Sequence, residues 1–251
     1  MNRYAIALWA HPRSLSTAFE RMILQRGDFY VLHEPFCTFY DTGSVEVMSP
    51  EGSLMRLDSY DAIADRIIEW AGRTNVFLKE TLEYRYDVLF RRVDLLQALT
   101  HSFLIREPEK TINSYYAMNP NFSFAEIGYG NLLDLYEELD KEKIGVADVV
   151  DADELLQDPA TVVRGYCDRT GIPYNPESLS WKPGESGLWR RTQKWHEGVS
   201  NSTGFTAAGQ QYSVNVKNHA GLQAYYEKSL PLYEKLKSLQ PTTYAFDSRS
   251  V

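Results

Sequence analysis

The chain has 251 residues, of which 43% are hydrophobic, and its formal net charge is −8. This charge argues against a nucleic-acid-binding surface, which needs a basic face, although local basic residues can still bind an anionic small molecule. No apolar run approaches the roughly 20 residues of a membrane span, and the first residues lack the pattern of a secretory signal. We therefore expect a cytoplasmic protein without a membrane span, folded as one domain over residues 1–251.

Short apolar runs alternate with longer amphipathic segments along the chain. The apolar runs predict buried strands over residues 4–9, 29–32, 75–79, 101–105 and 146–150. The amphipathic segments predict helices over residues 15–25, 59–71, 87–99, from Pro108 onward, 158–170 and 219–239. Strands that alternate with helices indicate right-handed βαβ units. The predicted fold class is therefore α/β, with three αβα layers and a mainly parallel central sheet.

The junction between the first strand and the first helix has the features of an anion-binding site. The sequence His-Pro-Arg-Ser-Leu-Ser-Thr leads directly into the helix, whose first backbone N–H groups are unpaired and carry partial positive charge. Arg13 adds a full charge, and hydroxyl donors come from Ser14, Ser16 and Thr17. The segment has neither the glycines nor the lysine of a Walker A loop. The alternative is that these hydroxyls only cap the helix.

A second basic position follows the fourth predicted strand. Arg106 comes at the carboxyl end of the strand over residues 101–105, where α/β folds place ligands. Ser114 comes about two turns into the next helix, so a guanidinium and a hydroxyl can bind one phosphate together. The alternative is that Arg106 forms a surface ion pair with Glu107 or Glu109.

These segments together resemble the sulfotransferases that use 3′-phosphoadenosine 5′-phosphosulfate (PAPS). The first phosphate loop of that family reads Pro-[Lys/Arg]-Ser-Gly-[Ser/Thr]-Thr, and the residues here that match it are Pro12, Arg13, Ser14, Ser16 and Thr17. The second family motif has Arg, Pro two residues later and Ser eight residues after the Arg, a spacing reproduced by Arg106, Pro108 and Ser114. Residues 149–175 are also similar to a later structural passage of the family. The resemblance spans roughly residues 4–180.

The resemblance implies a P-loop-like sulfotransferase fold and PAPS as the donor. The loop Arg13–Thr17 would bind the 5′-phosphosulfate, and Arg106 with Ser114 would bind the 3′-phosphate. Leu15 occupies a position that is commonly glycine in the family, so we expect a negative φ there and a side chain turned away from the phosphate. The Pro-Arg-Ser-Leu-Ser-Thr variant also resembles a bacterial and plant subgroup of sulfotransferase-like proteins. No metal is expected.

Sulfuryl transfer needs a base near the acceptor hydroxyl and positive charge near the leaving oxygen. Glu34 follows the second strand, whose end adjoins the phosphate loop, and some sulfotransferases have a glutamate in the equivalent place; we expect it to be the general base. His33 is the alternative, since its ordinary pKa suits proton abstraction near neutral pH. Neighbouring side chains on a strand point in opposite directions, so only one of the two should face the site.

Two further groups of cations are candidates for the site. Lys79 ends the third predicted strand and could neutralise the bridging oxygen; the alternative is a lysine that is solvated or paired with Glu80. Arg13 occupies a position where many sulfotransferases have a loop lysine. Residues 181–205 combine three tryptophans with basic side chains, of which Arg191 and Lys194 are the predicted nucleotide contacts. A packed aromatic cluster with a basic rim is the alternative for this segment.

Tyrosines in segments near the predicted site favour a small hydroxyl acceptor of aromatic or apolar character; they are Tyr40, Tyr84, Tyr86, Tyr115, Tyr116 and Tyr129. A homodimer stays open. Two other functions are also compatible with the sequence. One is a non-catalytic nucleotide-binding protein that keeps the sulfotransferase fold, and the other is a P-loop-like phosphotransferase, which would need Mg²⁺.

Overall fold

Five parallel strands form the central sheet of the computed structural model, which describes residues 3–189, 191–206 and 211–241. The strand order is β2-β5-β1-β6-β7. The strands span β1 (Ala5–Ala10), β2 (Tyr30–His33), β5 (Val76–Thr81), β6 (Thr100–Ile105) and β7 (Val146–Asp151). Each of the five predicted strands is present within two residues of its expected bounds. The predicted parallel sheet is confirmed.

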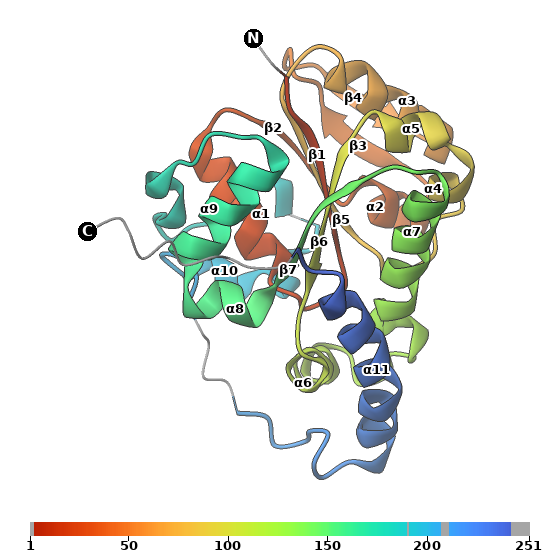
Figure 1. Ribbon diagram of the computed structural model, residues 1–251, viewed down its shortest axis with the longest axis vertical. Helices are drawn as coiled ribbons and strands as arrows, with labels where there is room; N and C mark the ends of the chain where they lie inside the picture. The colour runs from red at the N-terminus through yellow and green to blue at the C-terminus, as the bar shows by residue number, and fades with distance from the viewer. Residues whose placement is uncertain (1–2, 190, 207–210, 242–251) are drawn as a thin grey trace.

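Helices cover both faces of this sheet. On one face lie α1 (Ser16–Arg26), α8 (Ala152–Gln157) and α9 (Pro159–Thr170). On the other face lie α3 (Tyr60–Ala71), α4 (Val88–Arg91), α5 (Val93–Gln97) and α7 (Tyr129–Lys141). Figure 1 shows these two layers on opposite sides of the strands, with α6 (Pro108–Met118) and α11 (Ala220–Ser238) toward one end of the molecule. The three-layer αβα fold is therefore confirmed.

Successive side chains of β1 point to opposite faces of the sheet and pack against the helices on each face. Ile6, Leu8 and Ala10 belong to the apolar cluster that includes α1 and α9. Ala7 and Trp9 belong to the cluster on the other face, with α3 and α7. All five side chains are fully buried, as expected for a central strand covered on both faces.

Local sequence signals account for the helix ends that were predicted well. The Ser59 hydroxyl accepts a hydrogen bond from the Ala62 amide at 3.1 Å and starts α3. Asp158 caps α9 in the same way through the Thr161 amide, and Gly171 ends this helix at φ 77°. These are the ordinary start and stop residues of helices.

Other elements differ from the prediction. The helix expected over 87–99 is two short helices, since Arg92 leaves the helical conformation and binds three aspartates, Asp61, Asp65 and Asp94. The sequence reading missed α2 (Pro35–Thr42), α7, α8 and the short α10 (Glu197–Ser200). It also missed an antiparallel hairpin of β3 (Val45–Met48) and β4 (Leu54–Leu57), whose turn contains Gly52 at φ 88°.

No helix in the described ranges is long and apolar enough to cross a membrane.

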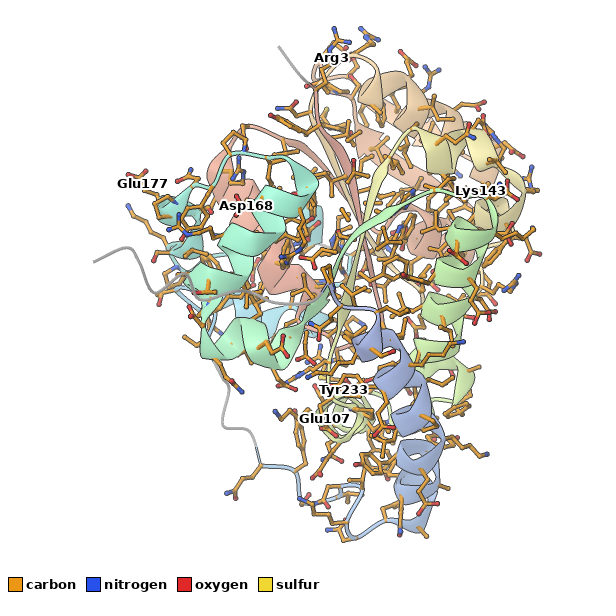
Figure 2. The ribbon with its side chains drawn as sticks, in the orientation of Figure 1. Arg3, Glu107, Lys143, Asp168, Glu177 and Tyr233 are labelled. Carbon is orange, nitrogen blue, oxygen red and sulfur yellow. The ribbon has the colours of Figure 1, made fainter. Side chains whose placement is uncertain are left out.

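The last helix, α11, is fixed to the end of β7 by polar contacts. The Tyr233 hydroxyl, labelled in Figure 2, donates to Asp151 at 2.6 Å, and the Lys237 ammonium lies 2.9 Å from the same oxygen. Asp151 is fully buried and also caps α8 through the Asp153 amide at 2.7 Å. One carboxylate thus holds the ends of three elements together.

We expect Tyr233→Phe to lower the free energy of unfolding by about 1–2 kcal/mol, because a buried carboxylate loses a hydrogen-bond donor. Tyr225→Phe removes a hydroxyl from the same helix without touching Asp151 and serves as the control. Urea denaturation of the three chains measures the difference. Equal stability of the two variants would contradict this role for Asp151.

Candidate active site

A cavity of about 830 Å³ opens at the carboxyl ends of the strands. Residues of the loop after β1 line it, including Arg13 and Thr17. Glu34, Lys79 and Thr81 line the cavity at the ends of β2 and β5. Arg106, which follows β6, and Ser114, which lies in α6, line it as well. The sequence therefore predicted much of the lining, because parallel strands bring their carboxyl ends to one edge.

The loop between β1 and α1 is held in an unusual backbone conformation. Arg13 has φ 64° and Leu15 has φ 71°, both in the left-handed region. The expectation of a negative φ at Leu15 is wrong. Leu15 instead adopts the conformation that a glycine would take at this position, and a non-glycine residue there costs roughly 1–3 kcal/mol. The loop thus keeps a glycine-like backbone without the glycine.

Arg13, Arg106 and Ser114 meet in this cavity. Arg13 Nε donates to Ser114 Oγ at 2.9 Å, and Arg106 Nη1 donates to the Arg13 carbonyl at 3.0 Å. The Arg106 amide also donates to His11 Nε2 at 3.0 Å. Burial comes first among the causes that lower the pKa of Arg13, and the charge of Arg106 adds to it. Two guanidinium groups held this close favour an anion between or beside them.

Some polar atoms of this region have no hydrogen-bond partner within the described residues. Arg106 Nε and Ser14 Oγ are both buried and unpaired. A buried donor without a partner costs roughly 1–3 kcal/mol. Ser14 itself is fully buried, whereas Arg106 lines the cavity, so the open position of Arg106 Nε can be satisfied by a bound anion.

Glu34 and Lys79 form a buried ion pair at the ends of β2 and β5. Lys79 is 1% exposed, and its ammonium donates to Glu34 Oε1, which also accepts from the Thr81 hydroxyl at 2.5 Å. Burial alone would raise the pKa of Glu34, but the charge of Lys79, together with the hydrogen bonds from Lys79 and Thr81, holds it below the usual range. Burial alone would lower the pKa of Lys79, but Glu34 and Glu20 raise it. Both groups are therefore ionised.

His33 lies behind Glu34 and is not part of the cavity wall. Its Nδ1 contacts both carboxylate oxygens of Glu20, at 2.9 and 3.0 Å, and its Nε2 lies 3.5 Å from Glu34 Oε2. Only Glu34 of the two neighbours lines the cavity, which agrees with the expectation that one of them faces the site, but their side chains approach each other instead of pointing apart. Glu34 leaves the strand with φ 46°, just before α2, and this turn brings its side chain back toward His33.

The late aromatic segment reaches the site through its backbone and through His196. Arg13 Nη1 donates to the Trp195 carbonyl at 2.9 Å, and Thr17 Oγ1 lies 3.0 Å from His196 Nδ1. Burial comes first among the causes that lower the pKa of His196 to about 3, and the charge of Lys79 adds to it, so His196 is neutral. The sequence reading did not select His196, although its position in a Trp-rich basic segment was a usable signal.

The two predicted nucleotide contacts of this segment have different surroundings. Arg191 lines the cavity and lies 3.3 Å from both Thr38 and Asp41. Lys194 is exposed, does not line the cavity, and places its ammonium over the Trp195 ring at 5.0 Å. The predicted roles of both stay predictions.

Acidic and aromatic side chains also line the cavity, and the acids were not predicted from the sequence. They include Asp41, Glu83, Tyr84, Tyr115 and Glu126. The Tyr115 hydroxyl donates to Glu83. Burial raises the pKa of Glu83 to about 7, and Glu126, Asp41 and Glu34 act in the same direction. Tyr84 stacks on Tyr40 at 3.9 Å, whereas Tyr86 and Tyr129 are buried in the core.

Among the described residues, no group of three or more His, Cys, Asp and Glu side chains is arranged to hold a metal ion.

A family model described as "Sulfotransferase domain" matches residues 4–240. The chain belongs to the sulfotransferase family. The resemblance to the sulfotransferase family that the sequence motifs indicated is therefore confirmed.

This sulfotransferase-family chain is similar to two proteins of Arabidopsis thaliana. They are "Branched-chain-amino-acid aminotransferase-like protein 1", 34% identical over 236 residues, and "protein 2" of the same name, 32% identical over 238 residues. Each match covers 92% of this chain but 41% of the relative, so the chain spans less than half of their length. The crystal structure of a sulfotransferase from Alicyclobacillus acidocaldarius has the same fold, with a TM-score of 0.51 at 13% identity, over 97% of this chain and 99% of that one.

The pKa of Glu83 predicts a dependence of stability on pH. A carboxyl whose folded-state pKa is raised contributes its full stability below about pH 4.5 and loses it as the pH rises through about 7. Relative to Glu83→Gln, the wild-type chain should therefore lose about 1–2 kcal/mol of unfolding free energy between pH 5 and pH 7.5. Urea denaturation at both pH values measures this. Parallel pH profiles for the two chains would contradict it.

Proposed function

We propose that this chain is an enzyme that transfers the sulfuryl group of PAPS to a hydroxyl of a small acceptor. One observation carries the proposal: Arg13, Arg106 and Ser114 meet in the same cavity that Glu34 and Lys79 line. The arginines and Ser114 suit a donor with two phosphate positions. Glu34 and Lys79 supply acid–base groups for an acceptor bound in the same cavity. We also propose that the region matched by the family model acts as one domain.

The donor fits the anion-binding end on three counts. The loop residues 13–15 precede α1 and Ser16 and Thr17 lie in its first turn, so the backbone and hydroxyl donors of this segment suit the 5′-phosphosulfate. Arg106 and Ser114 suit the 3′-phosphate, as the family motif implies. The unpaired Arg106 Nε is a buried donor that an anion would satisfy. The side chains of Arg13 and Ser114 already touch, so both phosphate positions belong to one continuous surface.

Glu34 and Lys79 supply the groups that the chemistry needs. The transfer is an in-line displacement, for which the protein positions the reactants and stabilises charge on the leaving oxygen. Lys79 stays protonated in its buried ion pair and is suited to that role. Glu34 is ionised, as a general base must be, but its lowered pKa makes it a weak base. Negative charge of a bound donor near Lys79 weakens the ion pair and strengthens Glu34 as a base.

The acceptor would occupy the end of the cavity lined by Tyr84 and Tyr115. Aromatic walls suit a flat or apolar acceptor. The carboxylates Asp41, Glu83 and Glu126 at the same end disfavour an anionic one. We therefore propose a neutral or positively charged hydroxyl compound as the acceptor.

Arg106→Ala tests the donor site. Adenosine 3′,5′-bisphosphate at 100 times its dissociation constant should stabilise the wild-type chain by about 2.7 kcal/mol, and ATP should do so much less. Arg106→Ala should weaken nucleotide binding at least 10-fold, since a charge-assisted contact contributes about 1.5–3 kcal/mol. Arg66→Ala, which removes an exposed arginine paired with Glu69, is the control. Thermal shift and calorimetric titration measure both effects. An equal increase in unfolding temperature with ATP would contradict the assignment of PAPS as the donor.

Glu34→Gln tests the base. Turnover with PAPS should fall about 100-fold, because general bases contribute about 10²- to 10⁴-fold to the rate. Affinity for adenosine 3′,5′-bisphosphate should change less than threefold, because Glu34 is not among the proposed phosphate contacts. Steady-state kinetics and calorimetry give the two numbers. Unchanged turnover in a correctly folded Glu34→Gln chain would remove Glu34 from this role.

A further inference from the structure

A glutamate on α1 is buried beside the proposed base without taking part in the chemistry above. Glu20 is fully buried, and a carboxylate is costly to bury unless it is paired and hydrogen-bonded. Its partners come from two distant segments. His33 Nδ1 lies 2.9 and 3.0 Å from its two oxygens, and Trp189 Nε1 donates to Oε2 at 2.9 Å.

These contacts set the orientation and the tautomer of His33. An indole N–H can only donate and an ionised carboxylate can only accept, so the hydrogen between Glu20 and His33 belongs to Nδ1. The opposite ring nitrogen, Nε2, then carries the lone pair. It faces Glu34 Oε2 at 3.5 Å and Thr192 Oγ1 at 3.4 Å. A carboxylate that fixes an imidazole in this way is a common feature of acid–base sites.

The charged and titratable groups around His33 come from each element packed there. Glu20 lies on α1, Glu34 precedes α2, Lys79 lies on β5, and His196 precedes α10. The rings of His33 and His196 are 5.3 Å apart, and His196 is neutral. Lys79 is already bound to Glu34. An imidazolium formed at His33 would lie between the carboxylates of Glu20 and Glu34.

We infer that Glu20 is a positioning residue for sulfuryl transfer, which holds His33 so that its Nε2 receives the proton that Glu34 takes from the acceptor. The inference rests on the proposed function. As the acceptor oxygen forms its bond to sulfur, the bond from sulfur to the bridging oxygen breaks, and its electron pair stays on the donor phosphate. The acceptor proton moves to Glu34 and then to His33, which becomes an imidazolium. Deprotonation to solvent restores the neutral ring.

Glu20→Gln tests this positioning role, because glutamine has only one side-chain oxygen. Trp189 N–H competes for that oxygen, which leaves the amide NH₂ facing His33 Nδ1 and forces the hydrogen onto Nε2, where it blocks proton acceptance. With PAPS and the best acceptor from a panel of phenols and aliphatic alcohols, kcat should fall about 10- to 100-fold. KM for PAPS should change less than about twofold, since Glu20 does not line the cavity.

Removal of the competing donor gives a matched second variant. Trp189→Phe alone should lower kcat less than about threefold. In the double variant Glu20→Gln/Trp189→Phe the single oxygen is free to accept from His33, so kcat should recover about fivefold or more over Glu20→Gln. A purely structural role of Glu20 predicts instead that the two losses add. Thermal unfolding of all four chains checks that each is folded.

A ¹⁵N nuclear magnetic resonance spectrum of the histidine rings gives a readout independent of any acceptor. The inference predicts the Nδ1–H tautomer of His33 in the wild-type chain and the Nε2–H tautomer in Glu20→Gln. The same tautomer in both chains, wild-type kcat in Glu20→Gln, or additive losses in the double variant would each overturn the inference and leave the proposed function intact. A wild-type chain that binds the nucleotide but transfers sulfuryl to no acceptor would overturn the proposed function itself.

Discussion

The site depends on a lysine and a glutamate that are buried together at the ends of neighbouring strands. Lys79 and Glu34 come from β5 and β2, which pair in parallel up to His33 and Lys79. Loss of either partner would leave an uncompensated buried charge, at a cost of about 3–5 kcal/mol. The pair therefore requires β2 to end opposite Lys79, two residues before β5 ends at Thr81. This requirement connects the register of the sheet with the position of the proposed base.

Backbone strain is concentrated in the same part of the molecule. Arg13, Leu15 and Glu34 are three of the four non-glycine residues with positive φ in the described chain, and all three line the cavity. Each sparsely populated conformation costs of order 1–3 kcal/mol and persists only where the surrounding structure enforces it. Here the enforcing contacts are visible. Arg106 binds the Arg13 carbonyl, and the Glu34 amide donates to the Lys79 carbonyl at 2.8 Å.

The sequence predicted the central sheet and the cavity edge well because both follow from short-range patterns. Five apolar runs gave the strands, and the parallel connection brought Arg13, Glu34, Lys79 and Arg106 to one edge without any knowledge of long-range contacts. The hairpin of β3 and β4 was missed because its strands are short and largely exposed. Its turn, Ser-Pro-Glu-Gly, carried a signal in Pro50 and Gly52 that the sequence reading did not use.

The site residues that escaped prediction are those fixed by distant contacts or by backbone turns. Glu20 looks like an ordinary polar residue on a surface helix, and the local sequence does not reveal the hydrogen bond that it accepts from Trp189, 169 positions away. The reversal of Glu34 toward His33 depends on a positive φ that alternation along a strand does not anticipate. Leu15 shows the same limit, since residue type alone argued for the opposite sign of φ.

The acidic character of the whole chain and the basic end of the cavity are compatible for a physical reason. Exposed charges are screened over about 8 Å at physiological ionic strength, so the net charge of −8 acts weakly on a group inside the cavity. The guanidinium groups of Arg13 and Arg106 are partly buried, where screening is weaker and nearby charges dominate. Besides Glu34, six carboxylates also line the cavity: Asp41, Glu83, Glu107, Glu109, Glu126 and Asp153. Lys110 pairs with Asp153 and Lys217 pairs with Glu109, so these charges offset one another. Binding of an anion therefore depends on the donors of Arg13 and Arg106, and the acidic surface chiefly lowers the rate at which anions arrive.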